Sequence, residues 1–390
     1  MTTPSLRPVA QVDLEAGDTM GATVCNGYLY LGHSGRTDIA TTVVDVRDPR
    51  SPRVVRQLLR DPGTRSAKAI AVDGILLTSC ERELDWGEPP FVRPVGGAEA
   101  WTGGLRIWDL AAPEDPQPIG FYPAGGAGVH RMTWLGGRYA YVTAGDAGYT
   151  DQFLHVVDLS DPSQPQEAGR WWYPGMWVGG GERPRFPGGR RYALHHALPG
   201  GDLLACGWWD AGLVLLDAAD PRAPQFVANL NWGPEVSGAT HTALPLPERD
   251  LLVVVDEAIL PPGRDIDKQV RLLDISEPHH PRLVSAFPTP TAEDDGVAVV
   301  DPRARFGPHN LGEPRPGTPF DDRYVFLTCF AGGLRVYDLE DPEKPVEVAA
   351  LVPDLGPDRV PQSDDVTADD RGFVYLTDRT GGGLTVLEWG

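Results

Sequence analysis

The sequence predicts an all-β protein with a single domain, residues 1–390, folded as a seven-bladed β-propeller whose last blade is completed by the N-terminal strand. Three observations carry this prediction: a motif that recurs six times, apolar residues with almost no helical periodicity, and two chain ends that complement each other. The motif is a pair of apolar residues and Asp, followed by a turn of the form Asp/Glu-Pro-x-x-Pro. Each copy marks one structural unit.

The copies are spaced as expected for four-stranded units. Their Asp residues lie between 49 residues apart, from Asp109 to Asp158, and 64 residues apart, from Asp45 to Asp109. Proline fixes φ and lacks an N–H donor, so the turn ends one strand and begins an edge strand. The copies are Val43–Pro52, Ile107–Pro116, Val156–Pro165, Leu215–Pro224, Leu272–Pro281 and Val336–Pro345, and the second has Ala112 in place of the acid.

The same order of strands is expected in every unit. A short innermost strand comes first, a second apolar run such as 139–143 follows, the third strand carries the motif, and the fourth starts after its second proline. The last unit, 364–389, has three strands, and residues 6–12 read as the fourth. Pairing the two chain ends would close the ring without an open sheet edge.

Composition excludes several classes of partner. The net charge of −21 disfavours nucleic acid and anionic membranes, which repel an acidic surface. No apolar stretch is long enough to enter a bilayer as a spanning helix, and residues 1–18 lack the features of a signal peptide. The four cysteines are scattered, with no metal-type pair. We therefore expect a reduced, cytoplasmic protein with no membrane insertion.

Histidines recur at one position of the repeat. Four of the nine histidines stand at the start of a first strand, and we call this set the histidine column: His130, His195, His241 and His309. In the other units the same position holds Gly21, Lys68 and Asp364. First strands line the central channel of a propeller, so these imidazoles are expected to converge on one axial point. Imidazoles without thiolates favour one transition metal ion, Fe(II) or Cu, with Zn as an alternative.

Some alternatives stay open at this stage. Because neighbouring strand residues point in opposite directions, a register shift by one residue would replace His195 by His196. The column could also form a polar channel that holds water or an anion. Ligating histidines usually donate their second N–H to an acceptor, and the candidates for that supporting role are Asp364, Asp365 and Glu257, each of which could instead be a solvated loop residue.

Long loops are expected over the same face as the column, where they would cover a small-molecule substrate. Aromatic residues would supply apolar area, and basic residues would hold a carboxylate or phosphate. The alternative is that these aromatic residues only pack the loops. The candidate substrate-binding residues are Lys68, Trp172, Trp177, Trp208, Trp209, Arg185 and Arg305, and the loops also carry Trp86, Phe91 and Arg303.

The repeated Asp-x-x-Asp/Glu-Pro-x-x-Pro motif resembles that of the LVIVD-repeat propellers and, more distantly, the selenium-binding protein (methanethiol oxidase) family. This resemblance covers nearly the whole chain, and it implies the fold more strongly than a function. Methanethiol oxidases are metal-dependent oxidoreductases, but no site residues can be carried over from them. The four axial histidines also resemble those of the carotenoid-cleavage oxygenases, which hold non-heme Fe(II), in architecture only.

Three functions follow from these observations. The first is a metal-dependent oxidoreductase or oxygenase that uses Fe(II) or Cu, with O₂ as a possible partner, on a small aromatic or sulfur-containing substrate. The second is a metal-dependent hydrolase, lyase or isomerase in which the metal acts as a Lewis acid. The third is a non-catalytic propeller that binds a protein and whose metal is structural.

Overall fold

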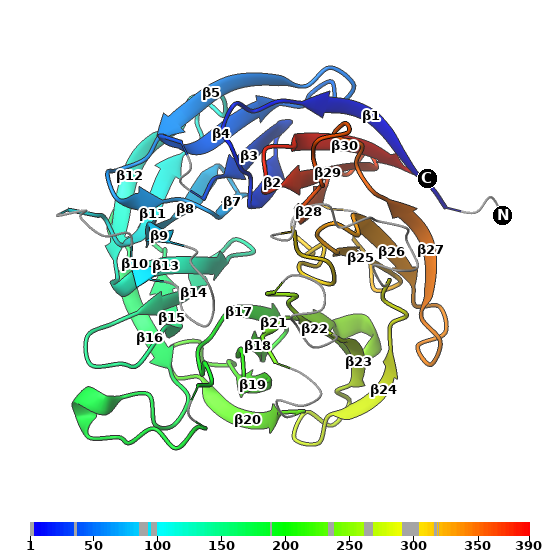
Figure 1. Ribbon diagram of the computed structural model, residues 1–390. Helices are drawn as coiled ribbons and strands as arrows, with labels where there is room; N and C mark the ends of the chain where they lie inside the picture. Colours follow the sequence, from blue (N-terminus) through cyan, green and yellow to red (C-terminus); the bar gives the residue numbers. More distant parts are fainter. Residues whose placement is uncertain are drawn as a thin grey trace.

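The computed structural model describes residues 4–34, 37–85, 93–94, 100–187, 189–232, 238–260, 268–290, 304–315, 318 and 320–390. Antiparallel sheets are arranged in a ring around a central axis, which confirms the predicted all-β propeller (Figure 1). Helical structure in the described residues is restricted to two 3₁₀ turns, η1 (Val178–Gly180) and η2 (Pro247–Arg249). Within the same residues, no helix is both long and apolar enough to cross a membrane.

Each blade runs from an innermost strand near the central axis to an outer edge strand, and is named by its innermost strand. The first three blades are β2 (Gly21–Cys25), β3 (Tyr28–Gly32), β4 (Ile39–Asp45) and β5 (Arg53–Leu59); β6 (Thr64–Arg65) with β7 (Ala69–Val72), β8 (Ile75–Arg82), β11 (Gly104–Asp109) and β12 (Gln117–Pro123); and β13 (Gly125–Thr133), β14 (Tyr139–Gly145), β15 (Phe153–Asp158) and β16 (Gln166–Trp171). A small hairpin, β9 (Leu84–Asp85) and β10 (Arg93–Pro94), is inserted after β8.

The remaining blades follow the same order. They are β17 (His196–Gly200), β18 (Leu203–Gly207), β19 (Leu213–Asp217) and β20 (Gln225–Leu230); β21 (Thr240–Leu246), β22 (Leu251–Asp256), β23 (Val270–Asp274) and β24 (Arg282–Ala286); β25 (Tyr324–Thr328), β26 (Leu334–Asp338) and β27 (Val346–Leu351); and β28 (Ser363–Ala368), β29 (Phe373–Asp378), β30 (Gly383–Trp389) and β1 (Leu6–Val12). In the β25 blade, the innermost position is taken by the segment around Leu311, which bridges to Leu327.

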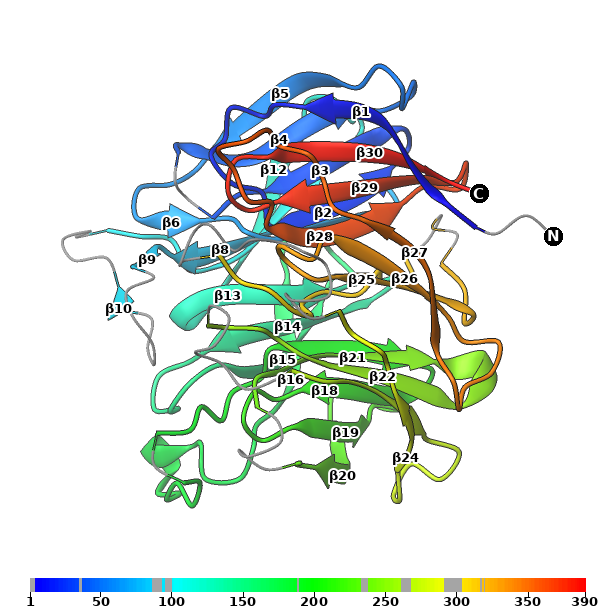
Figure 2. The same ribbon diagram turned by 45° about the vertical axis from the view of Figure 1, so that its right-hand side comes forward.

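The two ends of the chain share one sheet. Strand β1 pairs antiparallel with β30, from Leu6 opposite Trp389 to Val12 opposite Leu384. Figure 2 shows these strands side by side, blue against red. The outer strand of the β28 blade therefore comes from the opposite end of the sequence, and the β1–β30 ladder joins the chain ends.

The repeated Asp organises the turn between the third and fourth strands. Its carboxylate accepts the backbone N–H two residues further on, as in Asp158 with Ser160 at 2.9 Å and Asp274 with Ser276 at 2.9 Å. This Asx turn leads directly into the Pro-x-x-Pro segment. The cores lie between neighbouring blades. One of them packs Val253 and Val255 of β22 against Leu327 of β25. Apolar faces on both sides of each sheet explain the continuous apolar runs in the sequence.

Candidate metal centre

Two residues of the column lie at irregularities of the innermost strands. In β13, pairing passes from Val129 to Arg131, and His130 lies between them. In β21, pairing passes from Thr240 to Thr242, and His241 is the extra residue. A β-bulge interrupts the alternation of side chains and re-aims the extra one. His130 then approaches His195, and His241 approaches His309.

Isolated β-bridges connect the starts of two innermost strands to the preceding blade. Trp209, just after β18, bridges to Thr240, and Phe330, just after β25, bridges to Ser363. Both aromatic residues have left-handed backbone conformations, with φ of 39° at Trp209 and 47° at Phe330. This conformation costs about 1–2 kcal/mol for a residue with a Cβ, and such strain often occurs at functional sites. Here it places two aromatic rings against the column.

His130 and His195 form a close pair. Their Nε2 atoms are 3.1 Å apart. His195 donates from Nδ1 to the backbone carbonyl of His241 at 3.0 Å, and His130 donates from Nδ1 to the Glu81 carboxylate at 2.9 Å. A carbonyl and an ionised carboxylate can only accept, so in the neutral rings both Nε2 atoms carry lone pairs. Two lone pairs that face each other at this distance are expected to share a cation.

The distance fits two ligands of one metal ion. With metal–nitrogen distances of about 2.1 Å and a bond angle of about 95°, two ligand nitrogens are about 3.1 Å apart. The other explanation is a proton shared by the two rings, which requires one of them to be an imidazolium. Burial lowers the pKa of both rings, with the neighbouring cations Arg65 and Arg131 adding to the effect at His130 and His195 respectively. The imidazoles are therefore neutral at pH 7 and suited to bind a metal.

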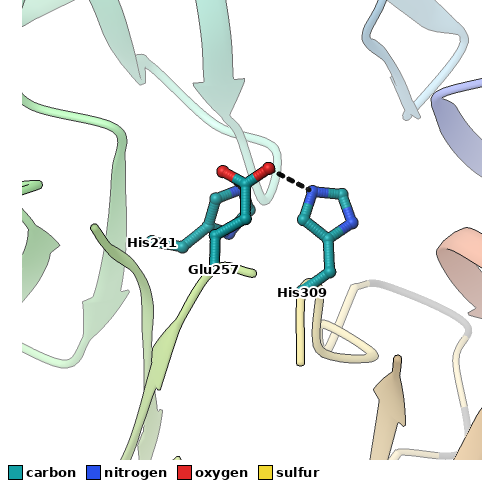
Figure 3. Close-up of side chains that lie close together, drawn as sticks. All are labelled: His241, Glu257 and His309. Carbon is teal, nitrogen blue, oxygen red and sulfur yellow. Dashed lines mark ion pairs between the residues drawn. The ribbon is translucent and has the colours of Figure 1, made fainter. Parts of the chain in front are cut away.

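A second group of ligand atoms lies beside this pair. One atom each from His241, Glu257 and His309 lie within 4.8 Å of one another, and all three side chains are buried. The carboxylate of Glu257 is 3.8 Å from Nε2 of His241 and 3.7 Å from Nε2 of His309 (Figure 3). Burial lowers the pKa of both imidazoles. This triad contributes two neutral nitrogens and a carboxylate.

The two groups are in contact but do not converge on a single point. The ring of His195 lies over that of His241, with centroids 3.6 Å apart. His241 and His309 have centroids 4.7 Å apart. His130 and His195 lie outside the triad of mutually close ligand atoms formed within the described residues. The histidines thus follow an arc across three neighbouring blades and the segment before β25, because each ring is held by its own Nδ1 partner.

The expected supporting carboxylates have other roles. His309 donates from Nδ1 to the backbone carbonyl of Asp364 at 2.9 Å rather than to its carboxylate. The Asp365 carboxylate accepts from the backbone N–H of Ala22 at 3.2 Å and so joins two blades. Glu257 faces the Nε2 side of the imidazoles, where a metal would bind, instead of supporting Nδ1. These placements correct the roles expected for the three acids.

Glu81 is the carboxylate that accepts the Nδ1 proton of His130, and sequence reasoning missed it. It lies in β8 and accepts from His130 and from Arg65, whose Nη2 is 2.7 Å away. Burial alone would raise its pKa, but Arg65 and His130 lower the pKa of Glu81 to about 2. The only signal in the sequence is an acid at the end of an apolar second strand, and nothing in the repeat distinguishes it.

The structure distinguishes His195 from His196. His196 points into a separate buried network, with its Nδ1 3.3 Å from Glu313 and its Nε2 2.7 Å from the Thr133 hydroxyl. Glu313 also pairs with Arg131 at 2.6 Å, which joins β13 to the segment before β25. This ionic network holds the channel wall together, whereas His195 belongs to the column.

Three of the expected substrate-binding residues lie beside the column. Trp209 contacts His195 edge-on, with centroids 5.5 Å apart. Arg305 pairs with Glu257 at 2.7 Å. The ammonium group of Lys68 is buried 3.7 Å from the Asp364 carboxylate and also donates to the Met20 carbonyl. Lys68 is therefore an ionic partner of Asp364 at the channel.

The other four expected residues lie elsewhere. Trp208 is fully buried in the core against Trp171, so it cannot contact a substrate. Trp172 and Trp177 pack against Tyr149 in the β13 blade, and Arg185 is exposed. Trp172, Trp177 and Arg185 all belong to the loop after β16. Trp86, Phe91 and Arg303 lie outside the described residues.

Comparisons with known proteins identify the fold. The LVIVD repeat matches residues 127–172, which corresponds to the β13 blade. Solved structures with similar folds include U3-55K (8% identity, 98% of each chain covered, TM-score 0.61). The β-propeller domain of Cps50 (Swd1) from Myceliophteria thermophila is similar too (13% identity, 98% of this chain and 99% of that chain, TM-score 0.59). A third is Sqt1 of Saccharomyces cerevisiae (9% identity, 99% of each chain, TM-score 0.55). No curated protein matches the sequence.

These likenesses show a β-propeller with an LVIVD repeat. At identities this low, the similarities support the fold but indicate no function. The distant resemblance to the selenium-binding protein family stays a prediction.

Proposed function

We propose that this protein is a metal-dependent oxidoreductase that binds one Fe(II) or Cu ion within the histidine column, at the pair formed by His130 and His195, and acts on a small organic substrate. The observation that supports this most directly is the 3.1 Å approach of the His130 and His195 Nε2 atoms, each with its Nδ1 proton committed to an acceptor. Without a cation, two lone pairs would repel each other in a buried site. The distant resemblance to methanethiol oxidases agrees with this choice.

The donor set favours a redox metal. Imidazole suits Fe, Cu and Zn, and a site without thiolates excludes the ligand set typical of Cu(I) thiolate sites and Fe–S clusters. His130 and His195 supply two nitrogen ligands, so an ion with five or six ligands keeps positions for a substrate or O₂. When bound, the ion would supply electron transfer to or from the substrate.

The protein's own residues would prepare the site. Glu81 and the His241 carbonyl fix the rings of His130 and His195 by accepting their Nδ1 protons. Trp209 lies edge-on to His195, and Phe330 stacks on His309 with centroids 4.4 Å apart. These two rings would exclude water from a bound substrate and orient it beside the metal.

Metal analysis of the purified protein tests the proposal. We expect about one iron or copper per chain, loss of that metal in His195→Ala, and full content in the control His280→Ala, which changes an exposed histidine. Anaerobic and aerobic spectra of the loaded protein should differ. A wild-type protein that binds neither iron nor copper after reconstitution, or a His195→Ala variant with unchanged content, would overturn the proposal.

A second function is supported by the triad of His241, Glu257 and His309. Two histidines and a glutamate form a ligand set found in catalytic zinc sites, with a fourth position left for water. Zinc bound there would serve a hydrolase, lyase or isomerase. In that case zinc is retained in His130→Ala, whereas the oxidoreductase proposal predicts loss of iron or copper in the same variant.

A further inference from the structure

Three cationic side chains from three different blades gather beside His309. Lys68 precedes β7, Arg305 precedes β25 and Arg379 follows β29. The neighbouring carboxylates are Asp364, Asp365 and Glu257, and the chain as a whole has a net charge of −21. Lys68 is buried and the two arginines are partly exposed, so the three cations differ in their access to solvent.

The two arginines share one aromatic surface. The guanidinium carbon of Arg305 is 5.3 Å from the centroid of Phe330, and that of Arg379 is 5.6 Å from it. His309 also stacks on Phe330, with centroids 4.4 Å apart. Both guanidiniums therefore border the ring on which the candidate metal ligand stacks. Each of them is paired with one carboxylate, Arg305 with Glu257 and Arg379 with Asp364.

The present partners do not use the full hydrogen-bonding capacity of this pair. Arg305 donates from Nη1 to Glu257 at 2.7 Å. Nη1 of Arg379 is 3.3 Å from Asp364 but forms no hydrogen bond with any described residue, and both carboxylate oxygens of Asp364 lack one too. Glu257 also faces two imidazoles, so a metal that binds Glu257 would weaken its bond to Arg305.

Both side chains keep some exposure, 19% for Arg305 and 15% for Arg379, so a small ligand can reach them.

We propose that Arg305 and Arg379 form an anion-binding subsite that holds the carboxylate of a small organic substrate beside the metal. The inference rests on the proposed function and adds the class of substrate to it. A planar guanidinium matches a carboxylate through paired N–H donors, which supports a carboxylate over a neutral group. Phe330 and Trp209 would flank the carbon part of such a substrate.

The test uses metal-free protein, prepared with a chelator, so that an anion cannot bind through the metal. Calorimetric titration compares benzoate and acetate with their neutral counterparts benzamide and acetamide. We expect at least one carboxylate to bind about tenfold or more tightly than its amide, because only the carboxylate forms charged hydrogen bonds with the guanidiniums. Arg379→Gln should abolish this preference, and Arg379→Lys should retain part of it.

The matched control is Arg359→Gln, which changes an exposed arginine whose Nη1 donates to the Gly381 carbonyl. It should bind the carboxylates as the wild type does. The inference is overturned if no carboxylate binds below about 10 mM, if acid and amide bind equally, or if Arg379→Gln changes nothing. Thermal melting of each variant reports whether it folds, and Arg379→Lys covers the case in which Arg379→Gln does not.

The result separates this inference from the proposed function. If the protein binds iron or copper but shows no preference for carboxylates, the metal proposal stands and the anion-binding subsite is wrong. If it binds carboxylates through Arg379 but binds no metal, the subsite stands and the oxidoreductase proposal is wrong.

Discussion

Nε2 of His130 and Nε2 of His195 lie 3.1 Å apart, and both rings have their Nδ1 protons engaged by acceptors. The two histidines come from neighbouring blades, 65 residues apart in the chain. Their approach depends on a bulge in β13 and on a hydrogen bond to the backbone of a third blade. The predictions below follow from this arrangement and from its supports.

Replacing either of two adjacent histidines should have different consequences. His195→Ala removes a metal ligand and should lower bound metal to a small fraction of the wild-type content. His196→Ala should keep the metal but reduce stability by about 1–3 kcal/mol, because Glu313 and the Thr133 hydroxyl lose a buried partner. Metal content and urea denaturation, measured on both variants, check this. Equal metal loss in the two would contradict the assignment of His195 to the column.

Glu81→Gln should weaken metal binding without removing a ligand. The carboxylate orients His130 and increases the basicity of its ring, and the loss of such a support costs about 10–100-fold in metal affinity. Competition with a chromogenic chelator measures the change. Glu83→Gln is the matched control, because Glu83 pairs with Arg60 at 3.0 Å instead. An unchanged affinity in Glu81→Gln would show that His130 needs no acceptor.

Gly207→Ala should disturb the site from a distance. A Cβ at Gly207 would lie 2.4 Å from the carbonyl oxygen of His241, the atom that accepts the Nδ1 proton of His195. The backbone of His241 must shift, so metal affinity should fall together with stability. In Gly169→Ala the new Cβ would lie 2.4 Å from the Arg222 carbonyl, which is remote from the column, so this control should lose stability and keep its metal. If both variants bind metal normally, the His241 carbonyl does not position His195.

Acidification should destabilise the fold through a buried histidine outside the site. Burial lowers the pKa of His155 to about 4, against about 6.5 in the unfolded chain. Below pH 6.5 the unfolded chain binds a proton that the folded protein rejects, so stability falls as the pH drops from 6.5 towards 4. In His155→Gln the loss of stability between pH 7 and pH 5 should be smaller by about 1–2 kcal/mol.

Urea denaturation of the metal-free protein at these two pH values measures this difference. The contribution is absent above pH 6.5, so wild type and variant should show the same pH dependence there. An equal loss of stability for both proteins between pH 7 and pH 5 would show that His155 is protonated in the folded state.

Much of the fold could be predicted because its signals are local and repeated. The Asp of each motif caps its own turn, and the prolines that follow start an edge strand. Each copy of the motif therefore predicts the third and fourth strands of its own blade. The pairing of residues 6–12 with the last strand followed from counting strands and is seen in the β1–β30 ladder. The position of the histidines within the repeat was also a local signal, and the histidine column was predicted from it.

The sequence by itself thus determined the all-β propeller, the turn between the third and fourth strands, and the recurrence of four histidines at one position of the repeat. The tertiary structure decided which atoms meet there: that His195 rather than His196 approaches His130, that Glu81 holds His130, and that Arg379 joins Arg305 on Phe330. The physical reason is that a strand alternates its side chains regularly, whereas a bulge and a contact between blades depend on residues far apart in the chain. The pattern within one repeat therefore does not predict these contacts between blades.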